Sequence, residues 1–188
     1  YEDVTNVDSV GVVTARGLNI FGNTTGLNAT GITILSSIKF TDTNIKIGST
    51  ALDSLTTGTN NVAIGDDVLT ANTSGGFNFA VGSLALSKNT TGSVNICIGN
   101  GMLENTTGGE NICIGSNALE DNTTADRNLA IGRESLKLGT TGYENIGVGY
   151  HASRSNTTGF GNVAIGVSAL YSNTASVTTA VGFQALKN

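Results

Sequence analysis

Hydrophobic and polar residues recur along most of this chain with a period of 17 positions, which shortens to 16 at two places. Each period contains a short apolar segment that starts with Asn and ends with Gly, such as Asn-Val-Ala-Ile-Gly at 61–65. A second apolar pair, often Ala-Leu, follows, and an Asn-Thr-Thr-Gly segment then leads to the next Asn. A short fixed period over most of a chain is typical of a solenoid or a fibre.

The Gly that ends each apolar segment is predicted to form a corner, because Gly has no Cβ to clash when the backbone bends. The Asn-Thr-Thr-Gly segment predicts a second corner, since Asn tolerates a left-handed φ and its side chain bonds the local backbone. The predicted structural corner residues are Gly48, Gly65, Gly82, Gly99, Gly115, Gly132, Gly149, Gly166 and Gly182.

The apolar segment of each period predicts a short buried strand. Two columns of apolar residues, which begin at Ile45 and Ile47, lie two positions apart and therefore share one face of a strand. Most members are β-branched, a type that fits a pleated buried surface. No segment keeps helical spacing across the Gly and Asn-Thr-Thr-Gly breaks. The predicted fold is all-β: a parallel β-roll or β-solenoid of about nine coils of 16–17 residues, spanning residues 44–188.

Residues 1–43 do not follow the period. Their short apolar alternations are interrupted by Gly, a pattern that indicates strands. We therefore expect a β-rich stalk or connector before the repeat domain. The chain begins with Tyr and its only Met is Met102, so we expect a processed chain or a part of a longer one.

Two apolar pairs per period make a narrow core and leave an apolar stripe exposed, which monomers rarely tolerate. We therefore expect a homo-oligomer, with a parallel homotrimer as the preferred assembly. A column of small residues lies between the two apolar columns, and we expect it to allow close approach between chains. The candidate chain–chain contact residues are Ala63, Ala80, Cys97, Cys113, Ala130, Gly147, Ala164 and Ala180.

Cys97 and Cys113 occupy the small column in adjacent periods. On neighbouring strands their Cα atoms would lie about 5 Å apart, which permits a disulfide. Facing strands rarely aim both Cβ atoms well, however, and Cys also packs as a small hydrophobe. The sequence favours packing and leaves a disulfide or a metal site as alternatives.

The composition narrows the classes of function. Only 12% of the 188 residues are charged, against about 25% in ordinary domains. The net charge of −5 gives no electrostatic basis for binding nucleic acid. No apolar run reaches the roughly 18 residues that a membrane helix needs, so we expect no membrane insertion.

No catalytic arrangement is evident, and we expect no enzyme activity, no cofactor and no metal. His151 is the only His and occupies a variable position, so it is expected to be an exposed polar residue. Glu104 and Glu120 share a column with Lys137 and Arg154, which indicates a solvated face. The repeat also lacks the Asp that calcium-binding rolls require.

Two other patterns leave a binding role open. Tyr143, Tyr150, Phe160 and Tyr171 fall in the last third of the chain, where aromatic rings either stack on glycans or serve packing and interfaces. Adjacent Thr pairs recur at the corners, and regular Thr rows on solenoids are typical of ice-binding proteins. Adjacent Thr side chains point apart, however, whereas a flat ice-binding face needs them to point the same way.

The Asn-Val-Ala-Ile-Gly-x-x-Ala core resembles the head repeat of trimeric autotransporter adhesins, which implies a left-handed parallel β-roll in a trimer. Their coil is commonly shorter, and Ser often stands where this chain has Ala. The longer Asn-Thr-Thr-Gly corner resembles repeats in tail-fibre-like structural proteins of phages, and so does the segment at 7–16.

The phage resemblance implies a structural segment of a tail fibre or virion appendage, located in the virion. It implies a homotrimer that contributes to host-surface attachment, with a host glycan or protein as the further partner. The first alternative is the head of a bacterial trimeric surface adhesin, located at the cell surface. The second alternative is an ice-binding β-solenoid.

Overall fold

The computed structural model describes residues 43–101 and 107–188. The stalk or connector predicted for 1–43 lies, apart from residue 43, outside the described residues, as does Glu104. The described part contains strands and turns and no helix that could cross a membrane.

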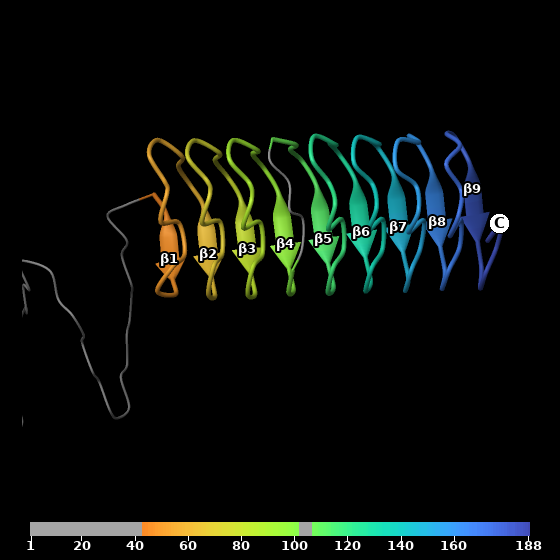
Figure 1. The fold of residues 1–188 in the computed structure, drawn as a ribbon, viewed down its shortest axis with the longest axis horizontal. Helices are drawn as coiled ribbons and strands as arrows, with labels where there is room; N and C mark the ends of the chain where they lie inside the picture. Colours follow the sequence, from red (N-terminus) through yellow and green to blue (C-terminus); the bar gives the residue numbers. More distant parts are fainter. Residues whose placement is uncertain (1–42, 102–106) are drawn as a thin grey trace, which may run out of the picture. The chain divides into compact units, whose positions relative to one another are not determined.

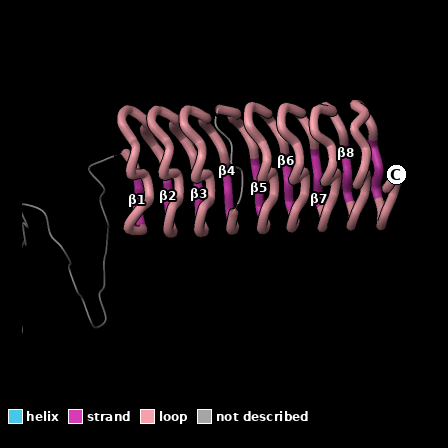
Figure 2. Tube along the Cα trace, viewed as in Figure 1, coloured by secondary structure: helices cyan, strands magenta, loops and turns pink. Residues whose placement is uncertain are grey.

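Within the described residues, nine strands of three residues lie side by side in chain order and form one sheet (Figure 1). Each strand pairs in parallel with the next, so that β1 and β2 align Ile45 with Val62 and Ile47 with Ile64. Long turns, drawn in pink in Figure 2, connect successive strands. The strands are β1 (Ile45–Ile47), β2 (Val62–Ile64), β3 (Phe79–Val81), β4 (Ile96–Ile98), β5 (Ile112–Ile114), β6 (Leu129–Ile131), β7 (Ile146–Val148), β8 (Val163–Ile165) and β9 (Thr179–Val181).

This arrangement confirms the predicted parallel β-solenoid. Both 16-residue periods keep the register, because β4 still aligns with β5 and β8 with β9 residue for residue. The shortened coils therefore lose a residue from a turn and not from a strand, as expected when only the strands must stay aligned.

The orientation of the strands differs from the prediction. The β-branched columns, predicted to be buried, face outward, and Ile98 and Ile165 are 40% and 41% exposed. The small residue at the centre of each inner strand is buried instead, as at Ala63 and Ala130, which are 0% exposed. The period of two shows which residues share a face, but side-chain volume decides which face is inward. A coil this thin has room only for Ala, Cys or Gly opposite the second apolar pair.

The predicted Ala-Leu pair forms the other wall of the core. Ala85, Leu86, Ala118 and Leu119 are at most 1% exposed and pack in the same buried cluster as the central strand residues. The core of each coil is therefore one layer of small strand residues against one layer of Ala and Leu.

A ladder of Asn side chains completes the interior. Asn78 lies just before β3 and is 1% exposed. Its Nδ2 donates to Asn61 Oδ1 in the preceding coil (3.1 Å) and to the backbone oxygen of Gly92 (2.9 Å). Asn61 Oδ1 also accepts from the backbone N–H of Asn78 (3.0 Å). These bonds satisfy buried polar groups and join successive coils, so this column requires an amide that both donates and accepts.

Both corners form as predicted. All nine corner Gly residues have positive φ, from 118° at Gly82 to 148° at Gly99. At the second corner, Asn72 Oδ1 accepts from the N–H of Gly75 (3.0 Å), and Asn72 Nδ2 donates to the oxygen of Gly75 (2.9 Å). The Asn side chain thus closes its own turn.

Cys97 and Cys113 are joined by a disulfide between β4 and β5, with their Cα atoms 4.8 Å apart. The favoured prediction, in which the two Cys residues pack without a bond, was wrong. The structure has the disulfide that was the alternative. The bond lies inside the solenoid, because both side chains are fully buried.

Candidate functional site: the apolar sheet face and a polar network

The outer face of the sheet is an apolar surface that runs along all nine strands. Two columns of mostly β-branched residues form it, at the first and third positions of each strand. Many are more than a third exposed, which is unusual for large apolar side chains of a monomer when they are contiguous. The most exposed members are Ile47, Phe79, Ile96, Ile98, Ile114, Ile131, Ile146, Ile165 and Val181. We call these two columns the apolar sheet face.

The small column, predicted to contact other chains, does not reach the surface. Its residues turn into the coil of their own chain and are buried there, so they offer no area to a partner. The prediction was wrong because it assigned the β-branched columns to the core. The residues concerned are Ala63, Ala80, Cys97, Cys113, Ala130, Gly147, Ala164 and Ala180. An exposed apolar stripe is present, as predicted, but it consists of the residues of the apolar sheet face that were predicted to be buried.

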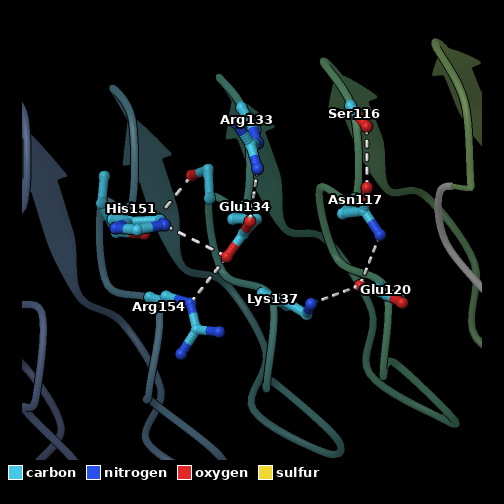
Figure 3. A network of polar contacts seen from close by, with 10 residues as sticks. Ser116, Asn117, Glu120, Arg133, Glu134, Lys137, His151 and Arg154 are labelled. Carbon is cyan, nitrogen blue, oxygen red and sulfur yellow. Dashed lines mark hydrogen bonds and ion pairs between the residues drawn. The ribbon is translucent and has the colours of Figure 1, made fainter.

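A second feature is a polar network on the turns that follow β5, β6 and β7 (Figure 3). At its centre, Glu134 Oε2 accepts from Arg154 Nε (2.9 Å) and lies 3.1 Å from His151 Nε2. Glu134 Oε1 is 3.4 Å from an Nη of Arg133. Two adjacent coils thus meet at one carboxylate, because Arg154 and His151 follow β7 and Arg133 and Glu134 follow β6.

The neighbouring coil repeats the arrangement with other residues. Glu120 Oε2 accepts from Lys137 Nζ (2.9 Å) and from Asn117 Nδ2 (2.7 Å). Ser116 in turn donates to Asn117 Oδ1 (2.7 Å). The predicted mixed column of carboxylates and cations is therefore a set of ion pairs between coils, with side chains about one quarter exposed or less in the pair Lys137–Glu120.

The network shifts the pKa of both carboxyls downward. The hydrogen bond from Arg154, partly opposed by desolvation, lowers the pKa of Glu134. Desolvation works against ionisation of Glu120, but hydrogen bonds from Lys137 and Asn117 outweigh it and lower its pKa. Both groups are therefore anionic at neutral pH and are held by cations, which suits a structural role better than proton transfer.

Aromatic rings gather at the same end of the solenoid, as the sequence indicated. The ring of His151 stacks on Tyr150 at 3.7 Å and meets Tyr171 edge-on at 5.5 Å. The rings of Tyr143 and Phe160 stack at 5.0 Å on the other corner of adjacent coils. His151, predicted to be an exposed polar residue, is instead partly buried between Glu134 and the rings of Tyr150 and Tyr171. Sequence position alone did not reveal that its neighbours in the next coils would be aromatic and acidic.

The described residues contain no pocket and no group of three side chains that could hold a metal ion. The carboxylates of the polar network accept hydrogen bonds from the basic side chains Lys137 and Arg154. The candidate site is therefore a pair of surfaces, one apolar and one polar. Searches for related proteins found no matching family model, curated protein or solved structure.

Proposed function

We propose that this chain is a structural segment of a phage tail fibre or related virion appendage. In this proposal it assembles as a homotrimer and contributes to host-surface attachment. The observation that carries the proposal is the apolar sheet face, which extends over all nine strands and is exposed in the single chain. Burial of apolar surface contributes about 25 cal/mol per Å², so covering this face with another copy would favour association against the entropy that association costs.

The geometry also suits a rod. Nine aligned strands at about 4.8 Å spacing give a stiff segment roughly 40 Å long. Parallel copies placed side by side would present the same columns to one another along their whole length, so that all coils contribute to one interface. The variable turns would remain outside and available for contact with a glycan or protein of a host surface.

A second candidate, the head of a bacterial trimeric surface adhesin, draws support from the disulfide between Cys97 and Cys113. Disulfides persist in oxidising compartments and are rare in proteins of a reducing cytosol. A secreted adhesin reaches such an oxidising compartment. Quantifying free thiols in the natural assembly separates the two candidates: a fully bonded pair favours secretion, and free thiols favour assembly in the cytosol.

The ice-binding alternative draws little support from the Thr pairs. The hydroxyl of the first Thr in several pairs is bonded to the backbone of the next coil, as at Thr123, which donates to Thr140 O (3.1 Å), and Thr140, which donates to Thr157 O (3.1 Å). Only the second Thr of such a pair is left to meet an ice lattice. Thermal hysteresis in dilute solution would restore this alternative.

Light scattering tests the proposed assembly. We expect a mass of three times the chain's 19.0 kDa. The double variant Ile114→Glu/Ile131→Glu places charges on the apolar sheet face and is expected to give a folded single chain. Thr124→Glu adds a charge at an exposed corner and serves as the matched control, with an unchanged mass. A wild-type mass of one chain would overturn the assembly and, with it, most of the proposed function.

A further inference from the structure

Two aromatic rings form a stacked pair at the corners that precede β7 and β8. The rings of Tyr143 and Phe160 lie 5.0 Å apart and are parallel to within 2°. Each residue is 39% exposed, so the pair lies at the surface. The pair is confined to two coils, because the same column holds small or polar residues in the other described coils: Thr59, Gly76, Ser93, Gly109, Asp126 and Ser176.

One face of the Phe160 ring packs on Tyr143, and the opposite face is turned toward the next coil. Ser176 is the residue of the same column in that coil, and its Oγ accepts from the N–H of Phe160 (3.1 Å). Because Ser176 carries only a hydroxymethyl side chain, it cannot cover the ring as a third aromatic residue would. This face of Phe160 is therefore open to a flat ligand.

Gly161 opens the surface further beside the Phe160 ring. The two preceding coils carry Arg127 and Glu144 at this position, and all three residues are left-handed, with φ of 63°, 57° and 56°. The backbone of this column therefore does not require Gly. A Cβ at Gly161 would meet only Val177 Cγ2, at 3.9 Å, so close approach does not require it either. We call the gap at Gly161, together with the Phe160 ring, the aromatic notch.

An ion pair lies at the edge of the aromatic notch. Arg127 Nε is 3.2 Å from Glu144 Oε1, and the two side chains are 52% and 54% exposed. Glu144 directly follows Tyr143 in the chain. A carboxylate that accepts hydrogen bonds and a guanidinium that donates them are thus held beside the ring pair, where both reach the solvent.

We infer that the aromatic notch binds a neutral hexopyranose unit of a surface polysaccharide. The C–H groups on the flat side of a pyranose ring are slightly positive and suit the negative face of the Phe160 ring. The sugar's hydroxyls would donate to Glu144 and accept from Arg127, and hydrogen bonds to charged groups are the stronger ones. The inference rests on the proposed function for its setting, since it names the class of ligand that attachment to a host surface would use.

The shape of the notch also suits one unit of a sugar chain. The described residues contain no pocket that could enclose a whole small molecule, so the ligand must be recognised on an open surface. A polysaccharide meets this condition, because one of its units can stack on the ring while the rest of the chain remains in water.

Nucleic acid and a second copy of the chain fit the notch less well. Bases also stack on aromatic rings, but their phosphates need a basic groove, whereas Asp126 and Glu144 lie beside the ring pair and the chain has a net charge of −5. A second copy aligned along the solenoid would meet the same column in every coil. The ring pair, however, occupies only two coils.

Binding is tested with the full chain on an array of printed glucose, galactose and mannose oligosaccharides. Phe160→Ala removes the stacking face, and Gly161→Gln fills the gap with an uncharged side chain as long as that of Glu144. We expect the wild type to bind at least one of these oligosaccharides and each variant to lower the apparent affinity by about tenfold. Phe77→Ala is the matched control, because it removes an equally large ring, 63% exposed, from a coil without the ring pair. Its affinity is expected to be unchanged.

Urea unfolding shows whether each variant is folded, and light scattering of the same samples gives its mass. Two results would overturn the inference: a wild type that binds none of the oligosaccharides better than Phe160→Ala does, or a lower mass of both notch variants, which would identify a second copy as the occupant. The proposed function fails separately. A trimeric wild type without binding contradicts the sugar site alone, whereas a single-chain wild type that binds through Phe160 contradicts the assembly alone.

Discussion

Leu residues hold a left-handed backbone in this solenoid where Gly or Asn would ordinarily be expected. Leu69, Leu119 and Leu170 each have a φ of 51°. This conformation costs an L-residue about 1–2 kcal/mol. Full burial of a Leu side chain contributes about 1.5–3 kcal/mol, which offsets the cost. The N–H of Leu69 also bonds Ala85 O in the next coil (3.1 Å), so the strained residue joins the ladder between coils.

At the corner Gly residues, close approach adds to the requirement for a positive φ. A Cβ at Gly132 would lie 2.6 Å from the backbone oxygen of Gly149, whereas a Cβ at Gly182 would meet nothing closer than 4.0 Å. Both have φ above 120°. We expect Gly132→Ala to lower the free energy of unfolding by about 3 kcal/mol or more and Gly182→Ala by about 1–2 kcal/mol. Urea unfolding of both variants measures the difference, and equal losses would show that the clash is unimportant.

The disulfide is expected to stabilise the solenoid by restricting the unfolded chain. It closes a loop with a sequence separation of 16, for which chain entropy predicts about 3 kcal/mol. Cys97→Ala/Cys113→Ala introduces the residue that adjacent coils already carry, so packing changes little. We expect the double variant to unfold at lower urea concentration by roughly that free energy. The reduced wild type should behave like the variant, and a reduced protein as stable as the oxidised one would contradict the prediction.

At the scale of the coil, the hydrophobic core is interrupted after β6. One buried cluster ends with Leu136, and a second begins with Ala152. Ser153 replaces Leu in the inner column, is fully buried, and its hydroxyl has no partner. Gly147 takes the small position, where a Cβ would collide with Ser135. We call this junction between the coils of β6 and β7 the seam.

Replacing Ser153 should strengthen the seam. Ser153→Leu restores the column residue and removes an unsatisfied buried hydroxyl, so we expect the free energy of unfolding to rise by about 1–2 kcal/mol. Ser153→Ala removes the hydroxyl without filling the column, so we expect it to raise the free energy of unfolding by less than Ser153→Leu does. Thermal and urea unfolding of the two variants make the comparison, and a destabilised Ser153→Leu would show that the seam has already closed around Ser.

The polar network spans the seam from outside, so its charge state should affect stability. Because the pKa of Glu134 is lowered in the folded chain, its contribution is present above the carboxyl's ordinary pKa and is lost as pH falls through the lowered value. We expect Glu134→Gln to cost about 1 kcal/mol at pH 7 and progressively less toward pH 3. Urea unfolding of both proteins across this pH range measures the difference in their free energies of unfolding. A difference that does not change with pH would exclude the Glu134 carboxylate as its cause.

The sequence predicted the elements more reliably than their orientation. The strands, the parallel order and the corner Gly residues follow from the period, because register and turn chemistry repeat in every coil. Which face of the strands points inward could not be predicted from the period. Alternation shows that Ile64 and Ala63 lie on opposite faces, but not which of the two faces is buried. The neighbours of His151 were also missed, since Glu134 and Tyr171 lie one coil away on either side. The left-handed backbone of the Leu column could not be predicted from the sequence, because a Leu at this position is equally typical of a core residue with ordinary backbone angles.

At the scale of the whole molecule, the fold separates two kinds of apolar residue. Small side chains and Leu fill the coil, and the larger β-branched residues lie outside on the apolar sheet face. Moving Ile and Val outward is unfavourable for a single chain, because these residues then contact water. In the proposed homotrimer, copies would bury this face together, so stability of the fold and association of the chains should be coupled.

This coupling predicts that thermal stability depends on protein concentration. If association stabilises the folded chain, the unfolding midpoint rises with concentration, since binding that favours the folded state acts by mass action. We expect an upward shift of several degrees between about 1 and 100 μM for the wild type. Ile114→Glu/Ile131→Glu should unfold at one temperature throughout this range, because its charged face cannot associate, whereas Thr124→Glu should follow the wild type. A wild-type midpoint independent of concentration, measured in reversible scans, would mean that the coil is stable alone and that its apolar sheet face serves some other contact.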